Sequence, residues 1–205
     1  MMIKTTAAAA AACLGLLAGP AAAKDLRAVT EDGRKVLLSP DGKWRLDSSA
    51  PVAQALADSD TSPYRPVVKR FSVAFNPADW SLRPKQDSDG PNKRSFQHKT
   101  LPLQAMVISD EMPASNAAIK SVIVGNAKNA GATTTVLLDE TVRVSDKEVG
   151  SFRMAAALKD MEFVFWSYYF ANEDGNIQVT CFTAQALFYK YAEECRKFLA
   201  GFKID

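Results

Sequence analysis

The chain has 205 residues, of which 47% are hydrophobic, and a formal net charge of +2 at pH 7. This composition is typical of a folded protein and argues against a disordered chain. The small net charge gives no electrostatic reason to expect binding to nucleic acid or to an anionic membrane.

The first 23 residues have the pattern of a secretory signal peptide. Lys4 precedes an apolar run over residues 7–18, which is followed by the helix-breaking pair Gly19-Pro20 and three alanines. Signal peptidase requires small side chains just before the cut, so we predict cleavage between Ala23 and Lys24. The run is shorter than the roughly 20 residues that a membrane-spanning helix needs. We therefore expect the mature chain to lie in the periplasm.

Two alternatives to this cleavage stay open. The segment could remain as an uncleaved anchor, or Cys13 could carry a lipid, although the larger aliphatic residue usual three positions upstream is absent. Later segments are too polar to span a membrane, so we expect no transmembrane segment after cleavage. Because Lys4 is the only charged residue in 1–23, its removal lowers the formal charge from +2 to +1.

Residues 24–47 are predicted to form a small β-meander. Its strands fall at 26–30, 35–38 and 43–46, and the turn signals are Asp32-Gly33 and the stretch 39–42. Three short strands are marginally stable alone, so we expect the meander to dock on another part through Trp44. Residues 48–68 are rich in Ser, Asp and Pro and are predicted to be a linker.

The main domain is predicted to occupy 69–205. A strand at 70–75 is followed by a turn at 77–81, a charged surface loop at 82–94 and an extended segment at 95–109. A helix is predicted at 113–130, capped by Ser115 or Asn116 and closed by Gly131.

The second half of this domain alternates apolar and polar residues in the manner of β-strands. Strands are predicted at 133–144, 149–158, 161–171 and 177–182, with a last helix that begins at Thr183 or Ala184. The strand at 161–171 is apolar on both sides, which indicates a central strand covered on both faces. The expected class is α+β, an antiparallel sheet flanked by helices.

The mature chain retains two cysteines, Cys181 and Cys195. Cys181 lies on the apolar side of the last strand, and Cys195 lies in the apolar stripe of the last helix. A strand and the helix that follows it usually pack together, so a disulfide could close this loop and add about 3 kcal/mol. Two buried, reduced thiols are the alternative, and cysteine geometry cannot be derived from the sequence.

Four segments together resemble the PsbP-like domains. They are the helix at 114–130, the strand-turn-strand element at 140–150, the aromatic strand at 163–170, and the helix end with its apolar tail at 195–204. The family includes the extrinsic protein of plant photosystems, a eukaryotic nuclear import factor and bacterial periplasmic proteins of the DcrB type. The resemblance implies an α/β/α sandwich over about 69–205 in a mostly non-enzymatic family.

The residues that usually carry catalysis are scarce. His98 is the only histidine, and it stands between Gln97 and Lys99 beside a charged loop, which favours a solvated side chain. A Cys-x-x-Cys motif, a phosphate-binding glycine loop and a Gly-x-Ser-x-Gly elbow are all absent from the sequence. We predict no catalytic residue, no cofactor and no metal site.

A mild basic run offers a candidate binding loop for acidic groups. Because Asp87 and Asp89 interrupt the run, an ordinary solvated loop is the alternative. The residues of the candidate loop are Arg83, Lys85, Lys93, Arg94, His98 and Lys99.

Three functional hypotheses follow. The first is a non-enzymatic interaction or assembly module of the cell envelope, with an unknown partner and an unassigned oligomeric state. The second is a periplasmic small-ligand carrier that uses the aromatic residues of 163–170 to line a cavity. The third is a hydrolase that uses carboxylates alone, with acidic pairs available at Asp87/Asp89, Asp139/Glu140 and Glu193/Glu194.

Overall fold

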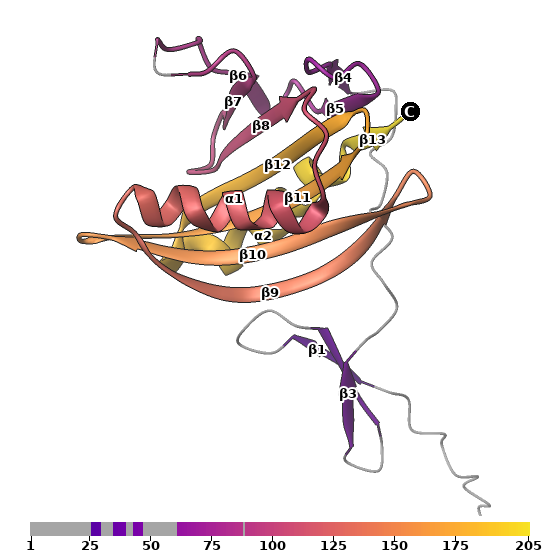
Figure 1. Ribbon diagram of the computed structural model, residues 1–205. Helices are drawn as coiled ribbons and strands as arrows, with labels where there is room; N and C mark the ends of the chain where they lie inside the picture. The colour runs from indigo at the N-terminus through magenta and orange to yellow at the C-terminus, as the bar shows by residue number, and fades with distance from the viewer. Residues whose placement is uncertain (1–25, 30–34, 40–42, 47–60, 88) are drawn as a thin grey trace, which may run out of the picture. The chain divides into compact units, whose positions relative to one another are not determined.

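The computed structural model describes residues 26–29, 35–39, 43–46, 61–87 and 89–205 (Figure 1). The chain divides into two compact units, Met1–Asp47 and Ser48–Asp205. The predicted signal peptide with its cleavage site, Cys13 and residues 48–60 of the predicted linker lie outside the described residues, as does the side chain of Trp44.

The first unit contains a three-stranded antiparallel sheet. Its strands are β1 (Leu26–Val29), β2 (Lys35–Leu38) and β3 (Trp44–Leu46), which pair in the order β1-β2-β3. The backbone N–H of Ser39 donates to the carbonyl of Lys43 at 2.8 Å and so closes the connection between β2 and β3. The arrangement is a β-meander.

A seven-stranded sheet forms the centre of the second unit (Figure 1). Its order is β6-β7-β8-β12-β11-β10-β9, and every neighbouring pair is antiparallel. The four long strands from β9 to β12 follow one another through tight turns, so sequence neighbours are also neighbours in the sheet. The strands are β6 (Trp80–Leu82), β7 (Lys93–His98), β8 (Gln104–Asp110), β9 (Thr133–Val144), β10 (Lys147–Leu158), β11 (Met161–Asn172) and β12 (Gly175–Ala184).

Strand β11 shows why the sheet has two distinct apolar faces. Successive side chains point to opposite faces, so Phe165 and Tyr169 lie on one face while Trp166 and Tyr168 lie on the other. The first pair packs with residues of α1, and the second pair belongs to a cluster with residues of α2. We call these the α1 face and the α2 face. The prediction that this strand is central and covered on both sides is confirmed.

Helix α1 (Asn116–Asn129) packs mainly against β11, β9 and β10. The predicted cap is confirmed, because the Ser115 hydroxyl accepts a hydrogen bond from the Ala118 N–H at 3.2 Å. Ile123 is the buried residue of the helix. The helix ends before Gly131, whose φ of 86° is a conformation that glycine adopts without strain.

Two elements cover the α2 face. Helix α2 (Gln185–Ala200) packs on β12 and β11, and beside it lies a small antiparallel sheet in the order β13-β5-β4. These strands are β4 (Ser62–Tyr64), β5 (Phe71–Phe75) and β13 (Phe202–Ile204). The ring of Phe71 contacts that of Phe170 of β11 at a centroid distance of 6.1 Å. At the corner between α2 and β13, a Cβ on Gly201 would collide with the carbonyl of Ala74.

The α+β class, an antiparallel sheet with two helices, is confirmed, but some segments differ from expectation. Strand β4 lies inside the predicted linker, with Pro63 on a strand at the border of its sheet, where proline is tolerated. Strand β6 overlaps the predicted turn and surface loop, and β7 begins inside that loop. The sequence of β7 holds one large apolar residue, Phe96, so its strand character comes from pairing with β8.

Candidate functional site

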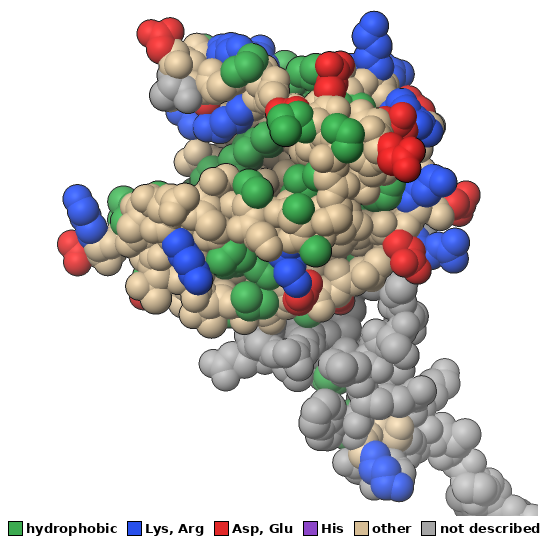
Figure 2. All heavy atoms as spheres, in the orientation of Figure 1, with side chains coloured by type: hydrophobic (Ala, Val, Ile, Leu, Met, Phe, Trp, Pro, Cys, Tyr) green, Lys and Arg blue, Asp and Glu red, His purple; other side chains and the backbone are tan. Residues whose placement is uncertain are grey.

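A groove of about 470 Å³ lies at one end of the seven-stranded sheet, where β7, β8, β11 and β12 end or begin and α2 starts. Figure 2 shows the surface hollowed between the β6–β7 region and α1, with hydrophobic side chains inside the hollow. We call it the strand-end groove. Its lining residues are Arg83, Gln97, His98, Leu101, Pro102, Leu103, Gln104, Phe163, Phe182, Thr183, Ala184 and Leu187.

One wall of the groove is polar and is built by sheet register. Gln97 and Gln104 face each other across β7 and β8. Arg83 joins them because its backbone N–H donates to the carbonyl of Ser95 at 2.9 Å, which extends the pairing beyond β6. The Nη1 atom of Arg83 then donates to Oε1 of Gln104 at 3.3 Å. The guanidinium group is therefore held beside two amide side chains.

His98 stands at the end of β7 and fixes the loop that follows. Its Nδ1 atom accepts hydrogen bonds from the backbone N–H groups of Thr100 and Leu101, at 3.2 and 3.1 Å. With Nδ1 acting as an acceptor, the neutral ring carries its proton on Nε2. The ring also packs edge-on against Trp80, at a centroid distance of 5.1 Å. The turn and Trp80 leave the side chain of His98 half-buried.

The opposite wall is apolar. Phe182 stacks on Phe165 with ring centroids 5.0 Å apart and an interplanar angle of 21°. Phe163 and Leu187 extend this wall along β11 and α2. The hydroxyl of Thr183 donates to the carbonyl of Pro102 at 2.6 Å, which ties the loop after β7 to the end of β12. The groove therefore has a fixed frame between its two walls.

The structure places two residues of the predicted binding loop, Arg83 and His98, in the groove and the other four elsewhere. Lys93 pairs with Asp89 at 2.9 Å, and Lys99 Nζ donates to the carbonyl of Pro77 at 2.5 Å. Lys85 is exposed in the loop. Arg94 lies near Tyr64: burial raises the pKa of Tyr64, and the positive charge of Arg94 opposes that rise.

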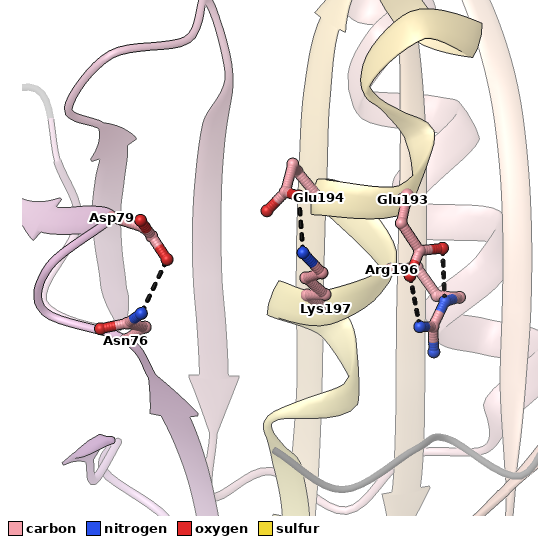
Figure 3. Close-up of polar contacts among 6 residues, drawn as sticks. All are labelled: Asn76, Asp79, Glu193, Glu194, Arg196 and Lys197. Atoms are coloured by element: carbon pink, nitrogen blue, oxygen red, sulfur yellow. Dashed lines mark hydrogen bonds and ion pairs between the residues drawn. The ribbon is translucent and has the colours of Figure 1, made fainter. Parts of the chain in front are cut away.

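The acidic pairs considered for hydrolysis are largely engaged with cations. Figure 3 shows Glu193 bound to Arg196 and Glu194 bound to Lys197 on α2, with shortest oxygen–nitrogen distances of 2.5 and 2.7 Å. Such i, i+3 pairs are typical of a solvated helix surface.

Two more acids, which lie outside α2, also have cationic partners. Asp139 pairs with Lys120 at 2.6 Å, and this hydrogen bond raises the pKa of Lys120. The hydrogen bond from Lys93 lowers the pKa of Asp89. Among the described residues, no group of three or more His, Cys, Asp or Glu side chains is placed to hold a metal ion.

A disulfide between Cys181 and Cys195 lies behind the groove, and this resolves the alternatives left open by the sequence. The two Cα atoms are 5.4 Å apart, and both residues are fully buried on the α2 face. Because Cys181 immediately precedes Phe182, the bond fixes the end of β12 against α2. The apolar wall of the groove therefore stands on a covalently tied support.

Several groove residues were not singled out from the sequence: Gln97, Gln104, Phe182 and Leu187. They come from separate segments that only the sheet register brings together, as the pairing of Gln104 with Phe182 illustrates. One usable signal existed, namely the apolar stretch 101–103 in a polar region, which begins three residues after the single histidine. An apolar loop beside polar residues is a frequent feature of binding surfaces.

No helix in the described part of the chain is both long and apolar enough to cross a membrane. No protein-family model matches the sequence, and no curated protein matches it.

Solved structures do match. The solution structure of cyanobacterial PsbP (CyanoP) from Synechocystis sp. PCC 6803 superimposes with a TM-score of 0.54 and 9% identity, over 73% of this chain and 95% of that one. The Ran-binding protein Mog1p of Saccharomyces cerevisiae gives a TM-score of 0.50 and 8% identity, over 70% of this chain and 95% of that one. At these identities the likeness concerns the fold alone. The chain has a PsbP-like fold, as the sequence resemblance implied.

Proposed function

We propose that this chain is an exported, non-enzymatic interaction module of the cell envelope, which holds a segment of a partner protein in the strand-end groove. The observation that carries the proposal is the groove itself, with one polar wall, one apolar wall and a frame fixed by Thr183 and the disulfide. The proposal treats α1 and α2 as the outer layers of an α/β/α sandwich over residues 69–205.

The openness of the groove favours a partner segment over a free small molecule. Small ligands depend on burying about 70–90% of their surface. The strand-end groove is open to solvent, so a small molecule would keep much of its surface in water. A segment of a protein gains further contacts outside the groove, and its binding does not depend on enclosure.

The state of the titratable residues supports a binding role over catalysis. Glu193, Glu194, Asp139 and Asp89 are engaged in ion pairs. The Nδ1 atom of His98 is occupied by backbone donors. A general base must be free to accept a proton from a bound group, and Nδ1 is already used to hold the loop.

Export is part of the same proposal. It comprises a signal peptide at 1–23 cleaved after Ala23, a β-meander at 24–47, a linker at 48–68 and a periplasmic location. The Cys181–Cys195 disulfide supports it, because such bonds persist in oxidising compartments. Lipid attachment at Cys13 is the alternative, and the mass of the mature chain distinguishes the two.

Position-specific photocrosslinking in living cells tests the proposal. A photoreactive phenylalanine analogue replaces Gln97 in the groove, and in a matched strain it replaces Val122, a residue of α1 that is 52% exposed. We expect one discrete adduct from position 97, little from position 122, and loss of the adduct when Phe182→Ala is added. Equal adducts from both positions, or none, would contradict the proposal.

A small-ligand carrier remains a second candidate, because about 470 Å³ lies within the usual range of ligand sites. Native mass spectrometry of the protein purified from its own compartment is the test. A carrier retains a discrete extra mass that Phe182→Asp removes, whereas spectra of the protein alone count against this function.

A further inference from the structure

The charge of the strand-end groove is one-sided. Of the described residues that line it, Arg83 carries a formal charge and none is acidic. The nearby acid Asp89 is already occupied, since its carboxylate oxygens bind Lys93 at 2.9 Å and the backbone N–H of Gln86 at 3.1 Å. Among the described residues, no carboxylate forms an ion pair with the guanidinium of Arg83, although Asp89 is near enough for the positive charge of Arg83 to help lower its pKa.

The polar wall also presents more donors than acceptors. Because Oε1 of Gln104 accepts the hydrogen bond from Arg83, its amide NH₂ group is left to donate elsewhere. His98 lines the groove with its Nδ1 atom occupied, and its ring packs against Trp80. A wall built from a guanidinium and neutral N–H donors matches a planar group with two acceptor oxygens and a negative charge.

The apolar wall fixes what must lie beside that negative group. Phe182 and Phe163 face the groove from β12 and β11, and Leu187 closes it at the start of α2. A bulky apolar side chain placed there loses contact with water, which is favourable by about 25 cal/mol for each Å² buried. A ligand that satisfies both walls therefore carries its carboxylate next to a bulky apolar group.

Resting on the proposed function, we infer that the strand-end groove selects a partner segment in which a glutamate or aspartate side chain stands next to a bulky apolar residue, with Arg83 binding the carboxylate and Phe182 contacting the apolar side chain. Arg83 is the formally charged residue among the described groove-lining residues, and the match of its guanidinium to an acidic segment carries this choice of partner. Gln104 positions Arg83 and does not itself need to contact the partner.

The test uses three capped tetrapeptides as probes, titrated into the ¹⁵N-labelled mature protein and followed by NMR. Their central pairs are Phe-Glu, Phe-Gln and Ala-Glu. We expect the Phe-Glu peptide to shift the amide resonances of Gln97, Leu101 and Gln104 and to bind about tenfold more tightly than either of the others. Each comparison removes one half of the proposed contact.

Variants of the protein then assign the preference to its residues. Arg83→Ala should abolish the preference for Phe-Glu over Phe-Gln, Arg83→Lys should retain part of it, and Lys85→Ala, in the same loop but outside the groove, should leave it unchanged. Well-dispersed spectra of each variant establish folding. A preference that survives Arg83→Ala, equal binding of Phe-Glu and Phe-Gln, or no shifts at millimolar peptide overturns the inference.

Failure of the carboxylate preference can be distinguished from failure of the proposed interaction role. If groove crosslinking from position 97 succeeds while the peptides show no carboxylate preference, the interaction role stands and the selectivity fails. Octanoate serves as a further arm, because it carries a carboxylate on an apolar chain without a peptide. Octanoate binding as tight as that of Phe-Glu would overturn the assignment of a protein segment and favour the carrier.

Discussion

The two faces of the seven-stranded sheet are covered differently. The α2 face carries α2, the small β13-β5-β4 sheet and the buried disulfide, and it holds most of the large buried aromatic residues. The α1 face carries one helix, which packs mainly on β9, β10 and β11. Towards β12, β8 and β7 this face ends in half-buried and exposed side chains such as Phe182 and Gln104. The comparison suggests that the α2 face supplies stability and the open end of the α1 face supplies recognition.

Replacing one phenylalanine on each face of the sheet by alanine should give the largest difference in the free energy of unfolding. Phe198 is 1% exposed and contacts Trp80 and Phe96 at centroid distances of 4.5 and 5.2 Å. Phe198→Ala should lower the free energy of unfolding by about 3–5 kcal/mol. Phe182→Ala, in the groove wall, should lower it by about 1 kcal/mol. Urea unfolding followed by tryptophan fluorescence measures both, and equal losses would remove the distinction between the faces.

Opening the disulfide should have the next largest effect. The bond closes a loop with a sequence separation of 14, for which loop closure contributes about 3 kcal/mol. The double variant Cys181→Ala/Cys195→Ala should lose this amount in urea unfolding. A reductant should lower the melting temperature of the wild type and leave that of the double variant unchanged. The bond would be shown to be absent if the reductant left the wild-type melting temperature unchanged and both cysteines could be alkylated without any reductant.

Alkaline pH should weaken the α2 face through Tyr168. Burial, with a smaller effect from the negative charge of Glu140, raises the pKa of Tyr168 from 10.0 to about 12. The unfolded chain then loses this proton at a lower pH than the folded chain does. The stabilisation is therefore complete below pH 10 and declines as the pH rises to about 12, by roughly 3 kcal/mol in all.

Denaturation at several pH values between 9 and 12 measures this decline. Tyr168→Phe should make the decline shallower, while Tyr64, whose pKa burial also raises, keeps part of the slope. Tyr189→Phe, at a position 51% exposed, should leave the slope as in the wild type. A slope that Tyr168→Phe leaves unchanged would assign the alkaline transition to other groups.

Substitution of two glycines on and near the α1 face should change stability by smaller amounts and in opposite directions. The ring of Tyr169 covers Gly150 so closely that an added Cβ would overlap it, and Gly150→Ala should cost about 1–3 kcal/mol. Gly125, inside α1, has open space around its Cα, and Gly125→Ala should stabilise the protein by about 0.5–1 kcal/mol. Thermal melting resolves the opposite signs. A stabilising Gly150→Ala would contradict the observed packing of Tyr169.

The sequence predicted the elements whose side-chain pattern is long and regular. Strand β9 has the predicted bounds, α1 begins after the predicted Ser115 cap, and Cys181 and Cys195 lie on facing apolar surfaces. Three short strands of the second unit, β4, β6 and β13, were not predicted as strands, because three residues cannot display a period. Strand β13 was expected only as an apolar tail, and it becomes a strand by pairing with β5.

The groove could be predicted only in part. Arg83 and His98 were singled out by their charge and rarity, and both line it. Lys93 and Lys99 were grouped with them by proximity in the sequence, yet an ion pair and a backbone carbonyl hold them elsewhere. Phe182 and Gln104 are far apart along the chain, and only the pairing of β12 with β8 places them together. Register between distant strands is a tertiary property that local patterns do not determine.

The most direct measurement of the central claim is the ratio of crosslinked product from position 97 in the groove to that from position 122 on α1. If the open end of the α1 face is the recognition surface, position 97 gives a discrete adduct well above position 122, and Phe182→Ala reduces the ratio towards one while the protein stays folded. A ratio near one in the otherwise unmodified protein, or an adduct that persists in Phe182→Ala, would contradict the account.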